Sequence, residues 1–596
     1  MGNKLKITIN GETVEVEKGT SILDAAKQVG VIIPTLCYHK DLCVAGNCRV
    51  CVVEIAGQKR LAAACATPCE EGMDVLTNTH KVRNSRKHII ELLLSEHNAD
   101  CTSCYKNGNC ELQLLASEYK IMNQDFIHLV PFRNYTVDMF SPSIIKDDSK
   151  CIRCQRCVRT CAELQSVNAL TMSYKGEHAK ITTFFEKSMN DVVCTNCGQC
   201  INHCPTGALV EKNYIEEVWS AIADKNKYVV VQTAPAVRVG LGEELGFDPG
   251  ERVTGKMVAA LKRLGFDAVM DTDFTADLTI MEEGTELLTR LKGALVDKNP
   301  DIKLPMATSC SPGWIKFIEH MYPDYLGNLS TCKSPQQMFG ALVKTYYAKA
   351  RKIEPDKIVS VSIMPCTAKK FEASRPEMHD SGYRDVDYVL TTRELAIMIK
   401  QAGIDFMKLN DMHYDRLMGE STGAGVIFGA TGGVMEAALR TAYELVTGRE
   451  VPFENLNINP VRGMDGVKEA TVKIEKPLSE WSFLEGVELR CAVAHGLVNA
   501  KKVMDAIKAG KANYHFIEFM ACPGGCLGGG GQPIPTSPEI RKRRAEAIYA
   551  EDAGMPLRKS HQNPEVVKIY KDFLGKPLGE KSHHLLHTKY VPRKRY

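Results

Sequence analysis

The sequence lacks any apolar run of membrane-spanning length and carries little excess charge of either sign. Its 75 Lys and Arg residues nearly balance its 72 Asp and Glu residues, which leaves a net charge of +3. A membrane span is therefore not expected, and a nucleic-acid partner is not favoured. The short basic runs at residues 541–544 and 593–595 are interpreted as solvent-exposed faces or tails.

The N-terminus also lacks the features of a targeting segment. Met1-Gly2-Asn3-Lys4 leads directly into a strand pattern, with no signal peptide and no twin arginine. We therefore expect a cytoplasmic protein. The length of 596 residues is too great for one hydrophobic core, so we expect several domains.

Cysteine is abundant, and its distribution is uneven. Of the 23 cysteines, 17 lie in the first 204 residues. A disulfide scaffold of that density is typical of small secreted proteins, which this long chain does not resemble. Clustered metal sites are the better interpretation.

The first 80 residues predict a domain that holds one metal cluster. Alternating residues at 7–10 and 14–16 around Gly11 predict a hairpin, and a short helix is expected at about 21–29. Thiols gathered on one loop, together with a more distant one, resemble a plant-type [2Fe-2S] ferredoxin. The expected ligands are Cys37, Cys48, Cys51 and Cys65. Cys43 and Cys69 are left over and are expected not to bind metal.

A second segment, residues 81–125, combines one histidine with three cysteines. An apolar run at 89–94 predicts a helix that delivers His97. A lone histidine is more often structural, but three cysteines follow at once. The arrangement resembles a His-Cys₃ [4Fe-4S] site, in which imidazole replaces one thiolate. Its expected ligands are His97, Cys101, Cys104 and Cys110.

Residues 126–212 contain two runs of the form C-x-x-C-x-x-C-x-x-x-C. This is the pattern of two-cluster bacterial ferredoxins, in which the fourth cysteine of each run binds the other cluster. Zinc would need separated pairs around one tetrahedral ion. The two expected ligand sets are Cys151, Cys154, Cys157 and Cys204, and Cys194, Cys197, Cys200 and Cys161.

The remainder of the chain predicts an α/β domain at residues 213–530. A helical pattern is expected from Gly207 to about Asp224. Short apolar strands then alternate with helices, which indicates largely parallel sheets, arranged as two lobes with a metal site between them. Strands are expected at 228–233, 358–363 and 388–391, and helices at 255–264 and 393–402. The tail at 531–596 is mostly helical and polar, and its histidines His583, His584 and His587 are not expected to bind metal.

Three cysteine motifs in this part carry the strongest signal. They are Thr308-Ser309-Cys310-Ser311-Pro312-Gly313-Trp314, Met364-Pro365-Cys366-Thr367-Ala368-Lys369-Lys370 and Glu518-Phe519-Met520-Ala521-Cys522-Pro523-Gly524-Gly525-Cys526-Leu527. Alone, the third motif could be a glycine turn with ordinary cysteines. Together they resemble the three signatures of [FeFe]-hydrogenases. The N-terminal cysteine spacing is also similar to that family and to the large iron-sulfur subunit of respiratory NADH dehydrogenase.

The resemblance implies ferredoxin-like iron-sulfur domains followed by a two-lobed α/β hydrogenase domain, in all a multi-domain α+β and α/β chain. It also implies an H-cluster, in which four cysteines hold a [4Fe-4S] cluster and one bridges to a diiron site carrying CO, CN⁻ and azadithiolate. The family has Cys-Cys where this chain has Cys310-Ser311. The second residue of that pair is the family's cluster ligand, and the first is its proton donor.

Three arrangements follow from this substitution. Cys310 could turn to the cluster and leave Ser311 near the diiron site, Ser311 could bind as an alkoxide, or the cluster could have three protein ligands. A serine hydroxyl gives up its proton far less readily than a thiol does. We therefore favour the first arrangement, in which the ligands are Cys310, Cys366, Cys522 and Cys526.

Other site residues are implied by the resemblance alone. Lys369 matches the lysine that hydrogen-bonds one cyanide, and Ala234 and Pro235 match a turn donating N–H to the other. The residues matching the lining of the diiron pocket are Gln336, Met364, Phe428 and Met520. Met520 and Phe428 could equally be ordinary core residues.

A proton route is also implied. Glu283 and Glu286 share one face of a helix at i, i+3 spacing, where buried carboxyls can relay protons. Ser330 matches the family's relay hydroxyl and Cys310 its terminal thiol. Without the resemblance, such a glutamate pair would be interpreted as a solvated helix face.

The implied activity is the reversible reaction 2H⁺ + 2e⁻ ⇌ H₂, with electrons passing through one [2Fe-2S] and three accessory [4Fe-4S] clusters. The electron partner would be ferredoxin, or NAD(P)H-oxidising flavoprotein and iron-sulfur subunits, since no G-x-G-x-x-G fingerprint follows a strand here. Maturation proteins would supply the diiron site. Two alternatives stay open: an electron-transfer subunit related to NADH dehydrogenase, and a sensory or low-activity relative.

Overall fold

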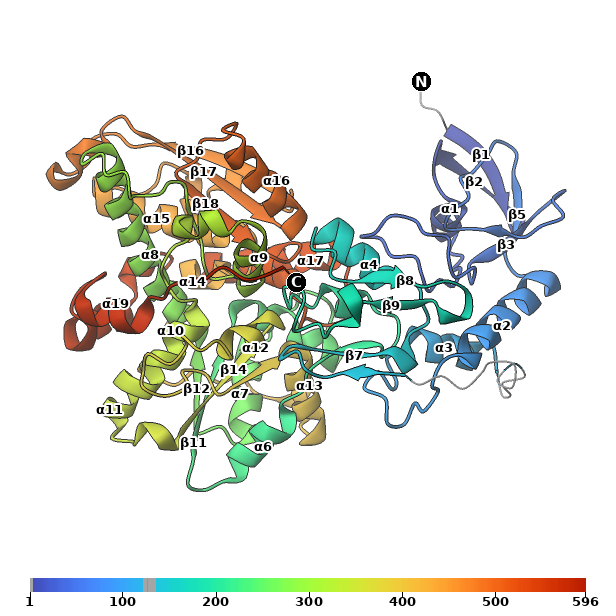
Figure 1. Ribbon diagram of the computed structural model, residues 1–596, viewed down its shortest axis with the longest axis horizontal. Helices are drawn as coiled ribbons and strands as arrows, with labels where there is room; N and C mark the ends of the chain where they lie inside the picture. The colour runs from blue at the N-terminus through green and yellow to red at the C-terminus, as the bar shows by residue number, and fades with distance from the viewer. Residues whose placement is uncertain (1–3, 122–125, 127–134, 596) are drawn as a thin grey trace.

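The computed structural model describes residues 4–121, 126 and 135–595. Two α/β lobes form the larger body, and the N-terminal domains extend from it as an arm (Figure 1). The arm ends in a five-stranded sheet of order β2-β1-β5-β3-β4. The predicted combination of iron-sulfur-type domains and an α/β domain is confirmed.

The sheet at the end of the arm is built around the predicted hairpin. β1 and β2 pair in antiparallel fashion, and Ser21 caps the short helix α1 by accepting a hydrogen bond from the Asp24 N–H. The hairpin and the helix are therefore confirmed. The elements are β1 (Lys4–Ile9), β2 (Glu12–Glu17), α1 (Ile22–Gln28), β3 (Val52–Ile55), β4 (Ala62–Ala63) and β5 (Asp74–Leu76).

The middle of the arm consists of short elements that hold cysteine loops. The predicted helix before His97 is α2, which ends at Ser95. The elements are α2 (His80–Ser95), α3 (Glu111–Glu118), β6 (Val137–Asp138), β7 (Ile144–Asp147), α4 (Arg156–Arg159), β8 (Thr171–Ser173), β9 (Lys180–Thr182), α5 (Gln199–His203) and β10 (Leu209–Glu211).

One expected helix begins later than predicted. Residues from Gly207 were expected to be helical, but strand β10 occupies the start of that segment and pairs with β7. The helix α6 covers only Ile215–Ala223. The pairing partner lies more than 60 residues earlier in the chain, so a local periodicity could not reveal it.

The first lobe contains a four-stranded sheet that is parallel throughout, of order β12-β11-β14-β15. Hydrophobic residues of the sheet pack on both of its faces, as expected for strands covered by helices. The predicted strands and helices are confirmed. The elements are α7 (Thr254–Leu264), α8 (Thr272–Leu295), α10 (Pro335–Leu342), α13 (Thr392–Gln401), β11 (Tyr228–Thr233), β12 (Ala268–Asp271), β14 (Ile358–Met364) and β15 (Tyr388–Thr391).

The second lobe contains a mixed sheet of order β13-β18-β17-β16. The edge strand β16 runs antiparallel to β17, whereas β13 and β17 are parallel to β18. The elements are β13 (Met306–Ala307), β16 (Val467–Lys473), β17 (Glu488–His495), β18 (Phe516–Met520), α9 (Pro312–Met321), α14 (Gly423–Ile427), α15 (Gly433–Thr447) and α16 (Leu497–Lys508).

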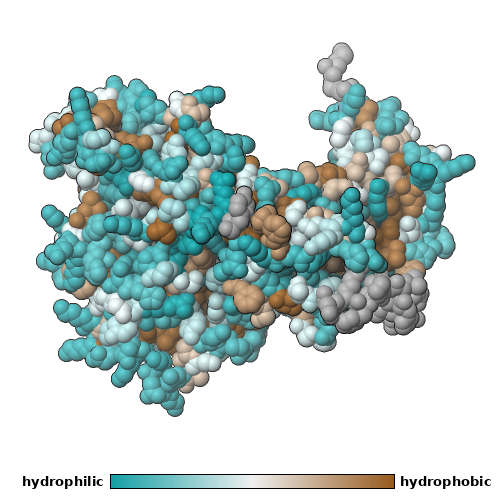
Figure 2. Space-filling view, viewed as in Figure 1, coloured by the Kyte–Doolittle hydropathy of each residue, from teal (hydrophilic) through white to brown (hydrophobic). Residues whose placement is uncertain are grey.

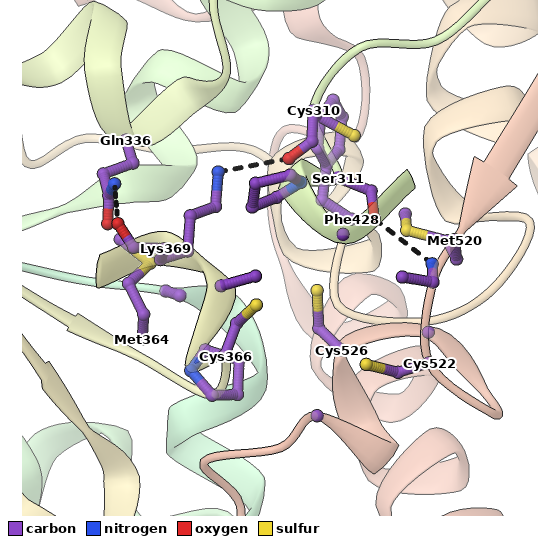
Figure 3. A pocket seen from close by; sticks show the side chains of 18 of the residues that line it. Cys310, Ser311, Gln336, Met364, Cys366, Lys369, Phe428, Met520, Cys522 and Cys526 are labelled. Atoms are coloured by element: carbon purple, nitrogen blue, oxygen red, sulfur yellow. Dashed lines mark hydrogen bonds between the residues drawn. The ribbon is translucent and has the colours of Figure 1, made fainter. Parts of the chain in front are cut away.

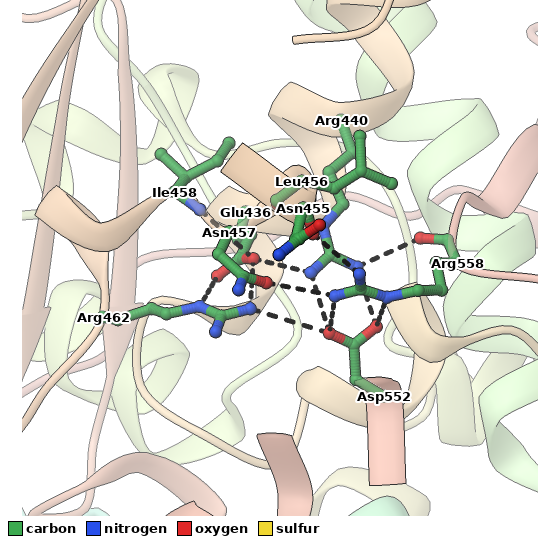
Figure 4. A network of polar contacts seen from close by, with 9 residues as sticks. All are labelled: Glu436, Arg440, Asn455, Leu456, Asn457, Ile458, Arg462, Asp552 and Arg558. Atoms are coloured by element: carbon green, nitrogen blue, oxygen red, sulfur yellow. Dashed lines mark hydrogen bonds and ion pairs between the residues drawn. The ribbon is translucent and has the colours of Figure 1, made fainter. Parts of the chain in front are cut away.

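The C-terminal segment is mostly helical, as predicted, and is fixed to the lobes by buried charges. Asp552 accepts hydrogen bonds of 2.8 and 2.9 Å from Arg440 and also pairs with Arg558 (Figure 4). Burial alone would raise the pKa of Asp552, but the two guanidinium groups lower it below its ordinary value. The helices are α17 (Pro538–Gly554), α18 (Pro564–Ile569) and α19 (Glu580–Leu586).

The interpretation of residues 541–544 as a solvated face is wrong for two arginines. Arg544 is fully buried and donates to Glu243 and to the Leu527 carbonyl. Arg541 is 8% exposed and forms a bidentate pair with Asp41 of the N-terminal domain. These arginines connect distant parts of the chain, because each has a carboxylate partner several hundred residues away.

The surface is predominantly hydrophilic on the face shown in Figure 2, with small hydrophobic patches scattered over it. Among the described residues, no helix combines the length and the apolar character needed to cross a bilayer.

Candidate active site

Three cysteine motifs meet because they follow neighbouring strand ends. Cys310 comes after β13, Cys366 after β14 and Cys522 after β18. The carboxyl ends of parallel strands in an α/β architecture open onto a common crevice, where ligands usually bind. The two lobes thereby bring all three motifs to one place between their sheets.

A cavity with about 780 Å³ of space between its walls occupies this crevice. Every predicted residue of the diiron pocket lines it, together with the predicted cluster cysteines. These residues are Ala234, Pro235, Cys310, Gln336, Met364, Cys366, Lys369, Phe428, Met520, Cys522 and Cys526. Ser311 and Cys197 line it as well. Glu283, Glu286 and Ser330 do not line the cavity and lie behind it.

Three thiols gather on one side of the cavity (Figure 3): Cys366, Cys522 and Cys526. Burial raises the pKa of Cys522 well above its ordinary value, and the neighbouring Cys366 and Cys526 raise it further. Buried thiols packed together in this way are costly to ionise without a compensating cation. Their donor set therefore fits a soft, positively charged metal cluster.

The Cys310 thiol does not join this group. Its sulfur points away from the other three thiols, and the Ser311 hydroxyl lies between (Figure 3). Burial raises the pKa of Cys310, with Glu283 as its strongest charged neighbour. The Ser311 Oγ accepts a 3.2 Å hydrogen bond from the Ala521 N–H, next to Cys522. In this view the Ser311 hydroxyl lies nearer than the Cys310 sulfur to the other three thiols (Figure 3). Which of the two residues binds the cluster stays a prediction.

Lys369 brings a cation into an otherwise apolar cavity. Its Nζ donates to the Cys310 carbonyl at 3.1 Å (Figure 3). It also donates to the Glu372 carboxylate at 2.9 Å. Glu372 also accepts hydrogen bonds from Gln336 and Ser334. The sequence interpretation gave Glu372 no role, although its i, i+3 spacing from Lys369 on α12 (Ala368–Ala373) was the available signal.

Ala234 and Pro235 line the cavity as part of the turn that is expected to donate an N–H group, but neither residue itself supplies that donor. Proline has no N–H, and the Ala234 N–H donates to the Ile363 carbonyl at 3.0 Å. A backbone donor from this turn has to come from a later residue, such as Ala236. Met520 and Phe428 form part of the apolar wall of the cavity and also belong to a large hydrophobic core cluster. They are therefore both cavity-lining residues and core residues.

The two relay glutamates lie on α8 and are buried, with Glu283 2% and Glu286 7% exposed. Ser330 hydrogen-bonds both carboxyls, donating to Glu286 at 2.9 Å. Arg290 pairs with Glu286 at 2.7 Å and is partly exposed. Burial, with the Glu286 charge, raises the pKa of Glu283 to about 8. A solvated helix face is excluded.

The four thiols of the first domain lie together as its ligand pattern requires. Cys51 and Cys65 are 3.3 Å apart at their sulfur atoms, and the Cys48 N–H donates to Cys37 Sγ at 3.4 Å. Cys37 also interacts with Cys65. Cys43 is exposed and donates to Glu163, and Cys69 belongs to the core of the domain. This arrangement fits one two-iron cluster.

His97 is suited to bind iron through one nitrogen. Its Nδ1 is buried and has no hydrogen-bond partner among the described residues. The other side of the ring hydrogen-bonds the Lys150 backbone, and burial lowers the pKa of His97 to about 4, so the imidazole is neutral. An orphaned ring nitrogen whose partner nitrogen is fixed by a carbonyl is typical of a metal ligand. Cys104 and Cys110 interact electrostatically, as neighbouring ligands would.

Two further cavities correspond to the two ferredoxin-type ligand sets. The first, of about 400 Å³, is lined by Cys151, Cys154, Cys157 and Cys204. The second, of about 340 Å³, is lined by Cys161, Cys194, Cys197 and Cys200. Each cavity contains the fourth cysteine of the other run. Cys197 lines both the second cavity and the large central one.

Known families match nearly the whole chain. The iron only hydrogenase large subunit, C-terminal domain, matches residues 227–530, and the iron hydrogenase small subunit matches 538–593. A 2Fe-2S iron-sulfur cluster binding domain matches residues 2–80. The NADH-ubiquinone oxidoreductase-G iron-sulfur binding region matches 86–125, and the NADH-quinone oxidoreductase subunit 3 ferredoxin-like domain matches 141–210.

Individual relatives agree with these matches. The chain is 53% identical to the NADP-reducing hydrogenase subunit HndD of Solidesulfovibrio fructosivorans over 99% of both chains. It is 41% identical to iron hydrogenase 1 of Clostridium pasteurianum, over 98% of this chain and 99% of the relative. The solved structure of a variant of apo [FeFe]-hydrogenase HydA1 from Chlamydomonas reinhardtii is 47% identical, with a TM-score of 0.57, and the match covers 64% of this chain and 99% of that one.

Proposed function

The chain belongs to the iron-only hydrogenase family, and on that premise we propose how its residues carry out the reversible conversion of protons and electrons into H₂. The observation that carries the proposal is the central cavity. It combines three clustered thiols, one cation and an apolar wall, and a buried carboxyl relay lies directly behind it.

We assign the cluster-binding role in this cavity to Cys366, Cys522 and Cys526, with the Ser311 oxygen nearest to the fourth position. The gathered, buried thiols support this assignment. When bound, the H-cluster supplies the iron site at which protons and electrons combine. Lys369, held by Glu372, directs its ammonium group into the cavity, where it suits an anionic ligand. Met364, Phe428 and Met520 exclude water from the same space.

Protons move along a chain of side chains that ends at the Cys310 thiol. Glu283 is the strongest charged neighbour of Cys310, and Ser330 joins Glu283 to Glu286. Because its pKa is raised to about 8, Glu283 is protonated at neutral pH and can donate a proton. Glu286 exchanges protons with the outside beside Arg290, which is partly exposed.

Electrons enter through the N-terminal arm. Cysteines for one [2Fe-2S] and three [4Fe-4S] clusters are spread along it, and Cys197 belongs to both the last ferredoxin-type cavity and the central cavity. This shared wall supports electron transfer from that cluster directly to the active site. The cysteines for the accessory clusters lie in the arm, whereas the central cavity and the proton relay lie in the larger body. Electrons therefore enter through the arm and protons through the body.

The electron partner we propose is an NAD(P)H-oxidising flavoprotein or iron-sulfur subunit. Two regions of the arm match iron-sulfur regions of NADH dehydrogenase subunits, and the relative HndD is named as a subunit of an NADP-reducing hydrogenase. The sequence contains no G-x-G-x-x-G fingerprint after a strand, so the nucleotide chemistry belongs to the partner.

The test is H₂ production by protein that has been matured with a diiron site. With reduced methyl viologen as donor, we expect H₂ from the wild type and none from Cys366→Ala, which loses a cluster ligand. NADPH or NADH alone should give no H₂ until a flavoprotein partner is added. Matured protein with full iron content and no H₂ production would contradict the proposal and favour a sensory or assembly role.

A further inference from the structure

A second group of metal-binding side chains lies at the far end of the proton relay. One ligand atom from each of Glu286, Cys332 and His587 lies within 4.8 Å of the others, and all three residues are buried. Cys332 and His587 have no part in the relay described above. They come from parts of the chain 255 residues apart, so the grouping is a product of the fold.

The C-terminal segment holds His587 in this position. His587 follows helix α19 and forms an antiparallel bridge with Cys332. The Thr588 N–H donates to the Thr331 carbonyl at 2.7 Å, and the Lys333 N–H donates to the Leu586 carbonyl at 2.8 Å. Backbone hydrogen bonds on both sides therefore fix the imidazole against the Cys332 thiol.

The distances suit a tetrahedral ion. The Cys332 Sγ lies 3.8 Å from Glu286 Oε2 and 4.0 Å from His587 Nδ1. An ion with bonds of about 2.3 Å to sulfur and 2.0 Å to nitrogen or oxygen separates such ligands by roughly 3.5 Å. The two distances from Cys332 exceed that value by a few tenths of an ångström, and the ligand atoms of Glu286 and His587 lie within 4.8 Å of each other. The Thr331 hydroxyl, 2.8 Å from His587 Nδ1, is beside the fourth position, where it or a water molecule could bind.

The outer side of the histidine is also arranged as in metal sites. His587 Nε2 lies 3.2 Å from Glu282 Oε2, and Glu282 is itself held by Tyr570, Ser582 and the Leu578 N–H. A carboxylate that accepts the second ring N–H of a ligating histidine fixes its tautomer and increases its basicity. Glu282 thus supplies the orienting group that such a site requires.

We propose that Glu286, Cys332 and His587 form a binding site for Zn²⁺ or a similarly soft divalent cation, and that the bound ion reversibly blocks the proton relay. On binding, the Cys332 thiol releases its proton to solvent and a thiolate–metal bond forms, while His587 binds as neutral imidazole. Glu286 then serves the ion and no longer accepts the Ser330 hydrogen bond. The binding part stands on the geometry alone, and the inhibitory part rests on the proposed function.

Binding is tested on protein that carries its iron-sulfur clusters but lacks the diiron unit. With one added equivalent of Zn²⁺, X-ray absorption at the zinc edge should show one sulfur ligand with nitrogen and oxygen, and no loss of iron. Loss of a group that only orients a metal ligand typically weakens metal binding roughly 10–100-fold. Cys332→Ala and His587→Gln each remove a ligand, so each should weaken zinc binding by at least that factor. Cys491→Ala is the matched control, because Cys491 is a buried thiol on β17 in the second lobe's sheet.

Inhibition is tested on the matured enzyme, with each variant normalised to its own rate without zinc. Zn²⁺ should inhibit H₂ production, a chelator should restore it, and Cys332→Ala and His587→Gln should raise the half-inhibitory concentration at least tenfold. Cys491→Ala should be inhibited like the wild type. Zinc bound without sulfur, or equally well by both site variants, would overturn the site, whether or not the protein produces H₂. Zinc bound as proposed without inhibition would overturn its action on the relay.

Discussion

The pKa of Glu283 makes the proton relay testable by one substitution, Glu283→Gln. Glutamine keeps the size and one hydrogen-bonding oxygen of the side chain but cannot carry a proton. Glu283 is 2% exposed, and among the charged groups around the Cys310 thiol, which lines the cavity, it has the strongest effect. We expect turnover to fall at least about tenfold, and up to the roughly 10²–10⁴-fold attributed to general acid–base groups.

The raised pKa of Glu283 also predicts how the free energy of unfolding changes with pH, which gives a second, independent quantity. Burial and the Glu286 charge raise the pKa of Glu283 from 4.5 to about 8. The folded protein therefore binds this proton more tightly than the unfolded chain does. The resulting stabilisation is fully present below about pH 4.5 and is lost as the pH rises to about 8. At 1.36 kcal/mol per pH unit, that loss amounts to roughly 5 kcal/mol.

Two measurements check these expectations. H₂ production by the wild type should decline as the pH passes through about 8, and the residual rate of Glu283→Gln should lack that step. An infrared band of a protonated carboxyl should titrate near the same pH and be missing from the variant. The control is Glu91→Gln, which alters a buried carboxyl on α2 outside the relay. Wild-type turnover in Glu283→Gln, or a carboxyl that titrates near pH 4–5, would refute the reasoning.

Three further predictions address the ligands and the fold. Cys310→Ser should retain the full iron content of the reconstituted protein and lose at least about 10²-fold in turnover, whereas loss of iron would identify Cys310 as a cluster ligand. His97→Cys should leave the iron count unchanged and lower the potential of one [4Fe-4S] cluster, because an anionic thiolate replaces a neutral imidazole; redox titration followed by electron paramagnetic resonance checks this. Asp552→Asn should destabilise the catalytic body by about 3–5 kcal/mol, since Arg440 and Arg558 lose a buried partner. Its control Glu539→Gln, in an exposed pair, should shift the calorimetric transition little.

Features set by local spacing could be predicted from the sequence. The hairpin at β1 and β2 and the strand β11 follow from patterns of a few residues, and the structure confirms them. The spacing of each cysteine run likewise restricts which thiols can meet, because neighbouring ligands on a tight loop cannot separate far. The two ferredoxin-type cavities contain the thiols that this reasoning combined.

Features set by distant partners could not be predicted in the same way. Whether Cys310 or Ser311 faces the other thiols depends on Ala521, more than 200 residues away, which holds the serine hydroxyl. Arg541 is buried in a pair with Asp41, 500 residues earlier in the chain.

The group formed by Glu286, Cys332 and His587 is another feature that local sequence patterns could not predict. A histidine near the end of the chain is ordinarily a surface residue, and its sequence neighbours do not suggest otherwise. The imidazole is buried because the segment around His587 forms a bridge with Cys332, and because Glu282 lies beside the ring. Metal-binding groups assembled from remote segments are therefore visible only in the folded chain.

The central claim, that this cavity holds a working diiron site, is tested most directly by the infrared spectrum of the matured protein. CO and CN⁻ ligands absorb in a region where proteins have no bands of their own. We predict sharp CO and CN⁻ bands in the wild type, which shift under H₂ and are missing from Cys366→Ala. A matured wild-type protein with its iron-sulfur clusters intact but without these bands would contradict the account.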